Sequence, residues 1–290
     1  MNKLKSVFIT LYTMWAAVGG VYSLFRFYGA GFKLSWLGPV MALLLPAGFL
    51  GYLMLFRPGG RTRPNLPVVS SLIILGGLVS LWSFIREDSV SLFPALLVLG
   101  GLAGWGLYLF WYSRLPQRTA ETITVGSKLP DFELADLRGE TVASSRLLDR
   151  PAVFLFYRGN WCPLCMAQIR EIAAQYRELD RRGVVVNLVS PQPVEQSRKL
   201  AERYQVNFRF LVDQDNRAAR RLGLLHRNGV PAGMELLGYQ SDTTLPAVII
   251  TDKQGTVIWY AVSDNYRVRP EPQTFLRVLD ENLAGPEQDG

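Results

Sequence analysis

The chain of 290 residues contains two cysteines, Cys162 and Cys165, and both lie in the segment Trp161-Cys-Pro-Leu-Cys165. A disulfide between them would close a very small loop and constrain little of the unfolded chain, so chemistry explains the pair better than cross-linking. Two thiols at this spacing, between a strand and a helix, are typical of a dithiol redox site. A closed zinc site needs four ligands, and the chain offers these two cysteines and one histidine, so we expect no metal and no other cofactor. Two inert thiols in the core are the alternative interpretation.

The segments that flank the cysteines predict how they are positioned. Residues 152–157 form a short apolar run rich in β-forming residues, which predicts a buried strand. From Met166 to Leu179 apolar residues recur at helical spacing, which predicts an amphipathic helix. Pro163 suits the first position of that helix, because a missing N–H costs nothing there. The free N–H groups and the positive end of the helix favour a thiolate, the reactive form of cysteine.

The rest of the carboxyl-terminal half alternates strands with helices and then forms a hairpin and a last helix. The hairpin signal is Asp252–Gly255, which lies between two β-forming runs. This order predicts an α/β fold with a mixed central sheet flanked by helices. The expected strands cover residues 184–190, 208–212, 247–251 and 257–262, and the expected helices cover residues 194–204, 216–222 and 274–283.

Four stretches of the amino-terminal half contain no charged residue: 6–25, 34–56, 65–85 and 89–113. About 20 apolar residues cross a bilayer as a helix, so we predict an all-α four-helix transmembrane bundle with the lipid bilayer as its partner. No stretch holds the ionisable side chain that an ion or proton pathway usually needs, which argues against a transporter. We therefore expect a transmembrane domain (residues 1–115), a linker (116–124), an α/β domain (125–285) and a tail (286–290).

The net charge of +7 belongs to the amino-terminal half. Residues 1–118 hold ten Lys or Arg against two acidic residues, whereas the remainder holds 21 basic and 22 acidic residues. The α/β domain therefore lacks the basic excess that is typical of nucleic-acid binding, and we expect no nucleic-acid partner.

The Lys and Arg residues around the four stretches predict an orientation. Seven of them lie at the amino terminus, in the loop at residues 57–64 or after the fourth stretch, and three lie on the opposite side. By the positive-inside rule, both termini and the α/β domain face the cytoplasm of a bacterial-type inner membrane. A periplasmic α/β domain is the alternative.

Small residues recur at spacings that suit helix packing. Gly100 and Gly104 form a Gly-xxx-Gly pair, and Ala47 with Gly51 is a looser version. Such pairs allow helices to approach closely. We interpret them as packing positions within the four-helix bundle, with a dimerisation face as the alternative. A homodimer is therefore a candidate assembly.

Five segments of the α/β domain follow a recognisable pattern: Gly126–Leu134, Phe156–Cys165, Ser190-Pro191, Phe210–Asp213 and Ile249–Gly255. Together they resemble the peroxiredoxin family, the alkyl hydroperoxide reductase and thiol-specific antioxidant proteins of the thioredoxin superfamily, over roughly residues 125–283. The resemblance implies a thioredoxin-like fold, antioxidant reduction of peroxides through a thiol/disulfide cycle, and an external thiol reductant as a partner.

The resemblance also implies roles for particular residues. In the peroxiredoxin register, Cys165 takes the peroxidatic position, Cys162 replaces a Thr or Ser, and Arg158 replaces a Pro. Arg269, fourteen residues after Gly255, takes the position of the family's active-site Arg. A cation there would stabilise a thiolate and polarise a peroxide. We favour this register because the similarity extends over the whole domain.

A thioredoxin register assigns the pair differently. Cys162, beside Trp161 and nearest the helix end, is then the exposed nucleophile, and Cys165 resolves the mixed disulfide. The Leu-Pro pair that ends at Pro246 resembles the loop that holds a cis-proline beside the cysteines in that family. Phe156 stands where thioredoxins bury an acid, so that proton-handling group is missing.

Three functions remain open at this point. The leading hypothesis is a membrane-anchored thiol oxidoreductase that reduces peroxides with the cysteine pair. A thioredoxin-like protein disulfide oxidoreductase or electron relay is the first alternative. A non-catalytic membrane module that uses the redoxin fold for docking is the second, because a fold alone does not determine a function. We interpret His226, in the turn-like segment Leu225–Gly229, as an exposed loop residue without a catalytic role.

Overall fold

The computed structural model describes residues 2–56, 61–86, 91–118 and 122–283. These residues form two compact units: four long helices, and a second unit whose main segment begins at Leu115. Parts of several predicted features lie outside the described residues, namely the loop at 57–60, the start of the fourth stretch at 89–90, the centre of the linker at 119–121 and the tail at 286–290.

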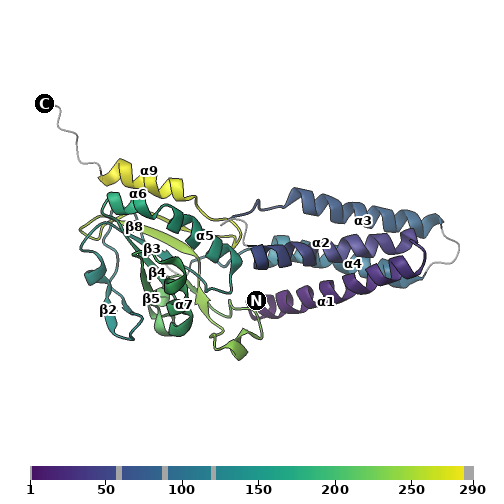
Figure 1. Cartoon of the computed structure of the whole chain (residues 1–290), viewed down its shortest axis with the longest axis horizontal. Coiled ribbons are helices and arrows are strands. Elements are labelled where there is room, and N and C mark those ends of the chain that lie inside the picture. Colours follow the sequence, from purple (N-terminus) through teal and green to yellow (C-terminus); the bar gives the residue numbers. More distant parts are fainter. Residues whose placement is uncertain (1, 57–60, 87–90, 119–121, 284–290) are drawn as a thin grey trace. The chain divides into compact units, whose positions relative to one another are not determined.

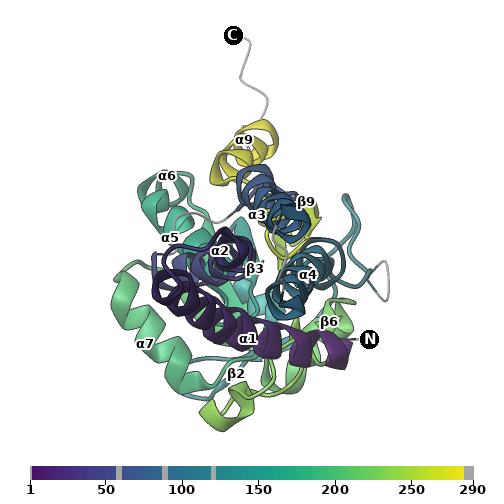
Figure 2. The same cartoon turned by 90° about the vertical axis from the view of Figure 1, so that its right-hand side faces the viewer.

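The first unit confirms the predicted region of four apolar helices. Each is long and apolar enough to cross a membrane. A π-helical turn, Tyr108–Tyr112, extends the last of them. The first helix is longer than its predicted stretch at both ends, because a helix continues through Lys3, Lys5 and Arg26, where the charge-free run stops. The helices are α1 (Asn2–Gly29), α2 (Leu34–Phe56), α3 (Pro67–Arg86) and α4 (Leu92–Leu107), shown in Figure 1 and, turned by 90°, in Figure 2.

Glycines of α4 allow aromatic side chains of α1 to approach its backbone. A Cβ atom added to Gly104 would lie 2.2 Å from the Tyr12 ring, and one added to Gly100 would lie 2.6 Å from the Trp15 ring. Both contacts are shorter than van der Waals distance, so only glycine fits. The Gly100–Gly104 pair therefore packs within the bundle, as predicted, and its surface is not available to a second copy.

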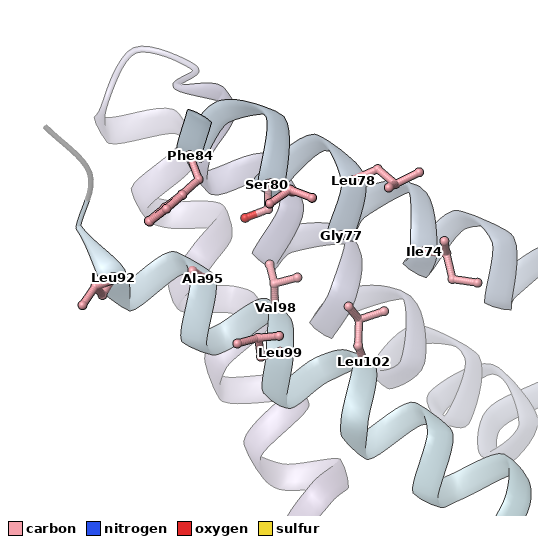
Figure 3. Close-up of a pocket in the computed structure, with 11 residues that line it drawn as sticks. Ile74, Gly77, Leu78, Ser80, Phe84, Leu92, Ala95, Val98, Leu99 and Leu102 are labelled. Atoms are coloured by element: carbon pink, nitrogen blue, oxygen red, sulfur yellow. The ribbon is translucent and has the colours of Figure 1, made fainter. Parts of the chain in front are cut away.

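An apolar groove of about 500 Å³ lies between α3 and α4 (Figure 3). Phe84, Leu92, Val98 and Leu102 are among its lining side chains, and Ser80 supplies a hydroxyl group. Lipid tails are as apolar as these side chains. The groove therefore belongs to the kind of surface that a bilayer covers.

The second unit is built on a seven-stranded mixed sheet in the order β2-β1-β5-β4-β3-β8-β9. The strands β3, β4 and β5 are parallel, whereas β8 is antiparallel to β3 and β9 is antiparallel to β8. This arrangement confirms the predicted thioredoxin-like α/β fold. The strands are β1 (Glu133–Ala135), β2 (Thr141–Ala143), β3 (Ala152–Phe156), β4 (Val185–Ser190), β5 (Arg209–Val212), β8 (Ala247–Thr251) and β9 (Val257–Val262).

In the described part of the chain, five α-helices accompany this sheet, four of which (α5, α6, α7 and α9) are labelled in Figure 1. They are α5 (Pro163–Ala174), α6 (Tyr176–Arg181), α7 (Val194–Tyr204), α8 (Arg217–Arg221) and α9 (Pro272–Leu283). The structure divides the single helix predicted over residues 166–179 into α5 and α6. Gln175 leaves the helical conformation (φ −95°, ψ 10°), and its N–H donates to Ile172 in a tighter turn. Apolar spacing does not detect such a break, because it continues on both sides.

A second, two-stranded sheet joins β6 (Leu225–His226) to β7 (Thr243–Thr244). The sequence did not predict it, because its strands are two residues long. His226 pairs with Thr243 there and is 4% exposed. The expectation of an exposed loop histidine was therefore wrong, because pairing with a segment seventeen residues away buries the ring.

The core on one face of the large sheet determines where β3 ends. Phe154 and Phe156 are fully buried in a cluster with Phe132, whose ring centroid lies 6.0 Å and 6.2 Å from theirs. Burial of each such ring contributes about 2–3 kcal/mol. The chain that follows Phe156 therefore starts from an anchored strand, and the cysteines lie in that segment.

Candidate active site

Cys162 lies in the segment between β3 and α5, and Cys165 lies in α5. Figure 1 labels both elements. Cys162 is the residue that caps the amino terminus of α5, with extended backbone (φ −87°, ψ 109°). Pro163 follows it in the first turn, as predicted. Cys165 lies one turn inside the helix. Both thiols are free and almost completely buried, at 1% and 0% exposed.

The environment separates the two thiols electrostatically. Burial opposes ionisation of Cys162, but the S–H and the backbone N–H of Cys165, together with Arg158 and Arg269, lower its pKa to about 6. Burial raises the pKa of Cys165, and its hydrogen bond to Cys162 and the negative charge there raise it further, against a smaller lowering by Arg269. The helix end and the nearby cations therefore favour a thiolate at Cys162 over one at Cys165.

This order differs from the register that we favoured from the sequence. The peroxiredoxin register gives the peroxidatic role to Cys165, whereas the helix end and the nearby cations favour a thiolate at Cys162. The physical reason is position: Cys162 lies at the positive end of α5, close to Arg158 and Arg269, whereas Cys165 is enclosed one turn inside the helix. The site electrostatics agree with the thioredoxin register.

Arg269 comes from the loop that precedes α9, more than a hundred residues after the cysteines. It is 4% exposed, and its Nη1 donates to the carbonyls of Asn265 (3.2 Å) and Val268 (3.0 Å). Its charge lowers the pKa of both thiols. The structure therefore brings Arg269 to the cysteines, and its catalytic role stays a prediction.

Arg158 precedes the cysteines in the same loop and is also 4% exposed. Its Nη2 donates to the carbonyl of Gly229, and its guanidinium lies 4.8 Å from the Trp161 ring centroid and 5.8 Å from that of Tyr266. Cation–π contacts on two rings hold the guanidinium in place. Its charge lowers the pKa of Cys162. Tyr266 was not predicted, because the ring contact joins segments that are distant in the sequence.

Gly159 shapes the turn between Arg158 and the cysteines. Its φ of +144° is rarely adopted by other residues, and a Cβ atom there would lie 2.5 Å from Nε1 of Trp161. Its carbonyl accepts the N–H of Cys162 at 3.1 Å. The absent side chain therefore allows Trp161 to fold back against the loop.

Pro246 immediately precedes β8 and is buried. Ala247 pairs with Phe156, so Pro246 lies at the edge of the sheet where β3 ends and the cysteine loop begins. No peptide bond among the described residues is cis, so the expected cis-proline was wrong. Backbone bonds from Leu245 N to Leu224 O (2.6 Å) and from Ser263 N to Pro246 O (3.0 Å) hold both neighbours of the Leu245–Pro246 bond in place.

The structure adds a buried polar network that the sequence analysis missed. The hydroxyl of Tyr157 accepts from Nε2 of Gln192 (3.1 Å), and Oε1 of Gln192 accepts from the N–H of Asn160 (2.7 Å). Tyr239 donates its hydroxyl to Oδ1 of Asn160. Burial raises the pKa of Tyr157. The sequence did offer a hint of this network, because Tyr157 and Gln192 are polar residues that each follow a buried strand.

No group of three or more His, Cys, Asp or Glu among the described residues could hold a metal ion.

Comparison with known proteins finds relatives of the redox unit. The AhpC/TSA family profile matches residues 125–260. Peroxiredoxin Bcp from Bacillus subtilis is 29% identical over 158 residues, which cover 53% of this chain and 96% of that protein. The thiol-disulfide oxidoreductase ResA from Geobacillus thermodenitrificans is 30% identical over 132 residues, 44% of this chain and 71% of that protein. Among solved structures, reduced Prx3 from Vibrio vulnificus in complex with H2O2 has a TM-score of 0.48 at 19% identity, covering 54% of this chain and 99% of that one.

Proposed function

Because this chain belongs to the AhpC/TSA family, we propose that it is a membrane-anchored thiol peroxidase that reduces peroxides with Cys162 and Cys165. Family membership makes it a thiol-dependent redox enzyme, which sets aside the non-catalytic docking module. The anchor is proposed from the four helices that are long and apolar enough to cross a membrane. The observation that carries the proposal is one thiolate-favouring cysteine beside two buried arginines, Arg158 and Arg269.

In the first step, the Cys162 thiolate attacks the terminal oxygen of a hydroperoxide ROOH. The O–O bond breaks, Cys162 becomes a sulfenic acid, and RO⁻ leaves and takes up a proton to give ROH. Charge moves from sulfur to the departing oxygen. Arg158 and Arg269 supply fixed positive charge for that oxygen in a site that excludes water.

In the second step, the thiol of Cys165 condenses with the sulfenic acid to form a disulfide and water. Cys165 is suited to this role, because burial and the neighbouring Cys162 raise its pKa and favour the neutral thiol. Two external thiols then restore the cysteine pair and leave as their own disulfide. An external thiol reductant is therefore a required partner.

Burial of both sulfurs favours a small substrate. The side chains of Cys162 and Cys165 are 1% and 0% exposed. A peroxide reaches such a sulfur through a narrow opening, whereas a protein disulfide must bring its own backbone and neighbours into contact. Peroxide reduction therefore requires a smaller rearrangement of the residues around the cysteines than exchange with a protein disulfide does.

Trapping experiments on the two single variants test the proposal. Cys165→Ser exposed to peroxide should accumulate a sulfenic acid at Cys162, detected as a dimedone adduct by mass spectrometry. Cys162→Ser should give no adduct and no peroxide turnover. A dimedone adduct at Cys165 in Cys162→Ser would instead support the peroxiredoxin register.

Protein disulfide exchange is the second candidate function. The order of the cysteines supports it, because the thiolate-favouring Cys162 comes first, as in the thioredoxin register. In this case, Cys165→Ser would trap a mixed disulfide between Cys162 and a partner protein without added peroxide. Peroxide-dependent turnover of the detergent-purified wild type, with no such adduct, would exclude it.

The side of the membrane is a separate proposal. The excess of Lys and Arg at the amino terminus, in the loop at residues 57–64 and after the fourth stretch supports a cytoplasmic redox unit. Cytoplasmic thiols are kept reduced, which suits a peroxidase that depends on a thiol reductant. A periplasmic redox unit would instead favour disulfide exchange.

A further inference from the structure

The candidate site holds more buried positive charge than the proposed chemistry uses. Arg158 and Arg269 are each 4% exposed, and neither forms an ion pair with an Asp or Glu anywhere in the described part of the chain. Both act on the one thiolate, at Cys162. Counting these three groups alone, the sum is one positive charge before oxidation, and two once Cys162 has become part of a disulfide.

Several N–H groups of these arginines have no acceptor. Nε of Arg158, and both Nε and Nη2 of Arg269, are buried without a hydrogen-bond partner. An unsatisfied buried donor costs about 1–3 kcal/mol, and more when it is charged. Retention of three such donors beside a reactive sulfur indicates that a ligand supplies the acceptors.

The free edge of Arg269 has the geometry of a carboxylate site. Nε and Nη2 lie on the same edge of a guanidinium and donate in parallel, which matches the two oxygens of a carboxylate. Nη1, on the other edge, is already bonded to Asn265 and Val268. The unsatisfied edge is therefore the bidentate one, and the carbonyl acceptors hold the group in place.

The surplus positive charge of the two arginines is larger than the reduction of a neutral peroxide requires. A hydroperoxide such as H2O2 brings no charge to the ground state, and one cation stabilises the oxygen that departs. Arg158 adds a second cation, held by the carbonyl of Gly229 and the rings of Trp161 and Tyr266. A substrate that has its own negative charge would use both.

We propose that Arg158 and Arg269 form a carboxylate-binding subsite beside Cys162, and that the preferred substrate is a small organic hydroperoxide with a carboxylate group. The specificity rests on the proposed peroxidase function. The reaction balances as before: the hydroperoxide oxidises the thiolate to a sulfenic acid and leaves as the corresponding alcohol. Its carboxylate is unchanged and remains paired with the arginines during the step.

Three related peroxides test the substrate preference. They are tert-butyl hydroperoxide, 3-hydroperoxy-3-methylbutanoate, which adds a carboxylate to one methyl group, and the methyl ester of that acid, which matches it in size without charge. The full-length enzyme in detergent should show at least tenfold higher kcat/KM for the acid than for the ester. Arg158→Gln should reduce this ratio toward one, while the control Arg203→Gln, on the exposed side of α7, should leave it unchanged. Equal kcat/KM values for acid and ester in the wild type would overturn the specificity.

A second measurement does not depend on peroxidase activity. In Cys165→Ser, the alkylation rates of Cys162 by iodoacetate, which is anionic, and by iodoacetamide, which is neutral, are compared with those of 2-mercaptoethanol. We expect the iodoacetate/iodoacetamide ratio at Cys162 to exceed that of the free thiol at least tenfold. A change in thiol pKa affects both reagents equally and cancels in the ratio.

Together, the peroxide kinetics and the alkylation ratio distinguish failure of the carboxylate subsite from failure of the proposed peroxidase function. A high alkylation ratio without turnover of any peroxide would support the subsite and reject the proposed function. Peroxide turnover with an alkylation ratio equal to that of 2-mercaptoethanol would support the function and reject the subsite. If Arg158→Gln does not fold, as judged by circular dichroism, Arg158→Lys retains the charge without Nε, and the wild-type comparisons remain decisive.

Discussion

The two units of this protein bury different kinds of side chain. In the helical unit, the close contacts join glycines to aromatic rings, as where Gly104 meets Tyr12, and no ionisable side chain lies within the charge-free stretches. The redox unit buries charged groups instead, including Arg158 and Arg269. A buried charge costs several kcal/mol unless it is paired. The redox unit retains buried charged groups, whereas the charge-free stretches of the helical unit contain none.

Within the redox unit, buried charges also differ among themselves. Asp213 is 1% exposed, but its two carboxylate oxygens accept the N–H groups of Ala218 and Ala219, each at 2.8 Å. It holds the start of α8 and has a structural explanation. Arg158 and Arg269 keep unsatisfied donors beside a thiolate. The two arginines are candidate site residues because their unsatisfied donors lie beside a thiol, whereas the hydrogen bonds of Asp213 explain its burial.

The largest expected effect is a difference in labelling between a loop of the helical unit and the redox unit, because we expect them on opposite sides of the membrane. In a Cys162→Ser, Cys165→Ser background, Lys33→Cys (between α1 and α2) should react with a membrane-impermeant maleimide on intact cells. Lys253→Cys, at the exposed tip of the β8–β9 hairpin, should react only after lysis, because positive-inside orientation places it in the cytoplasm. The opposite labelling pattern would place the redox unit in the periplasm.

A packing substitution should damage the helical unit without altering the thiols. Gly104→Val places new atoms within the Tyr12 ring, so we expect about 1–3 kcal/mol of destabilisation. Thermal unfolding in detergent measures it, and Gly106→Val is the matched control, since no atom lies within 4 Å of a Cβ there. Equal unfolding temperatures for the two variants would contradict the close packing of α1 on α4.

The pH dependence of alkylation tests the charge in the redox unit. The wild-type surroundings lower the pKa of Cys162 to about 6, and in Cys165→Ser the new hydroxyl takes the place of the S–H donor. If it keeps that pKa, Cys162 in this variant should react with iodoacetamide about tenfold faster at pH 8 than at pH 5, with a plateau above pH 7. An ordinary thiol would still be gaining rate at pH 8. Because folding lowers this pKa, its contribution to stability is present above the pKa of about 8.5 of the unfolded chain and is lost as the pH falls through about 6.

The smallest expected effect is the loss of one cation. Arg269→Ala should raise the pKa of Cys162 by about one unit, which corresponds to about 1.4 kcal/mol. Thiolate absorbance during a pH titration measures the shift. Arg277→Ala, on the exposed face of α9, should leave the titration unchanged. An unshifted curve for Arg269→Ala would return that residue to a purely structural role.

Local sequence patterns predicted most of the elements. The spans at 34–56, the strands at 247–251 and 257–262 and the helix at 194–204 agree with the structure to the residue, because each depends on a periodicity or a run contained within it. The boundary between α5 and α6 was missed for the same reason, since both sides share one apolar face. The short strands β6 and β7 have no periodicity to detect.

The sequence by itself determined that a dithiol lies at the start of a helix and that four apolar stretches precede the redox unit. Both are properties of neighbours along the chain. Only the tertiary structure decided that the surroundings favour a thiolate at Cys162, that Tyr266 and Trp161 hold Arg158, and that Pro246 is trans. Those outcomes depend on burial and on charges from segments far apart in the sequence. A charge acts through space over a few ångströms, and no spacing along the chain reports which segments meet at that distance.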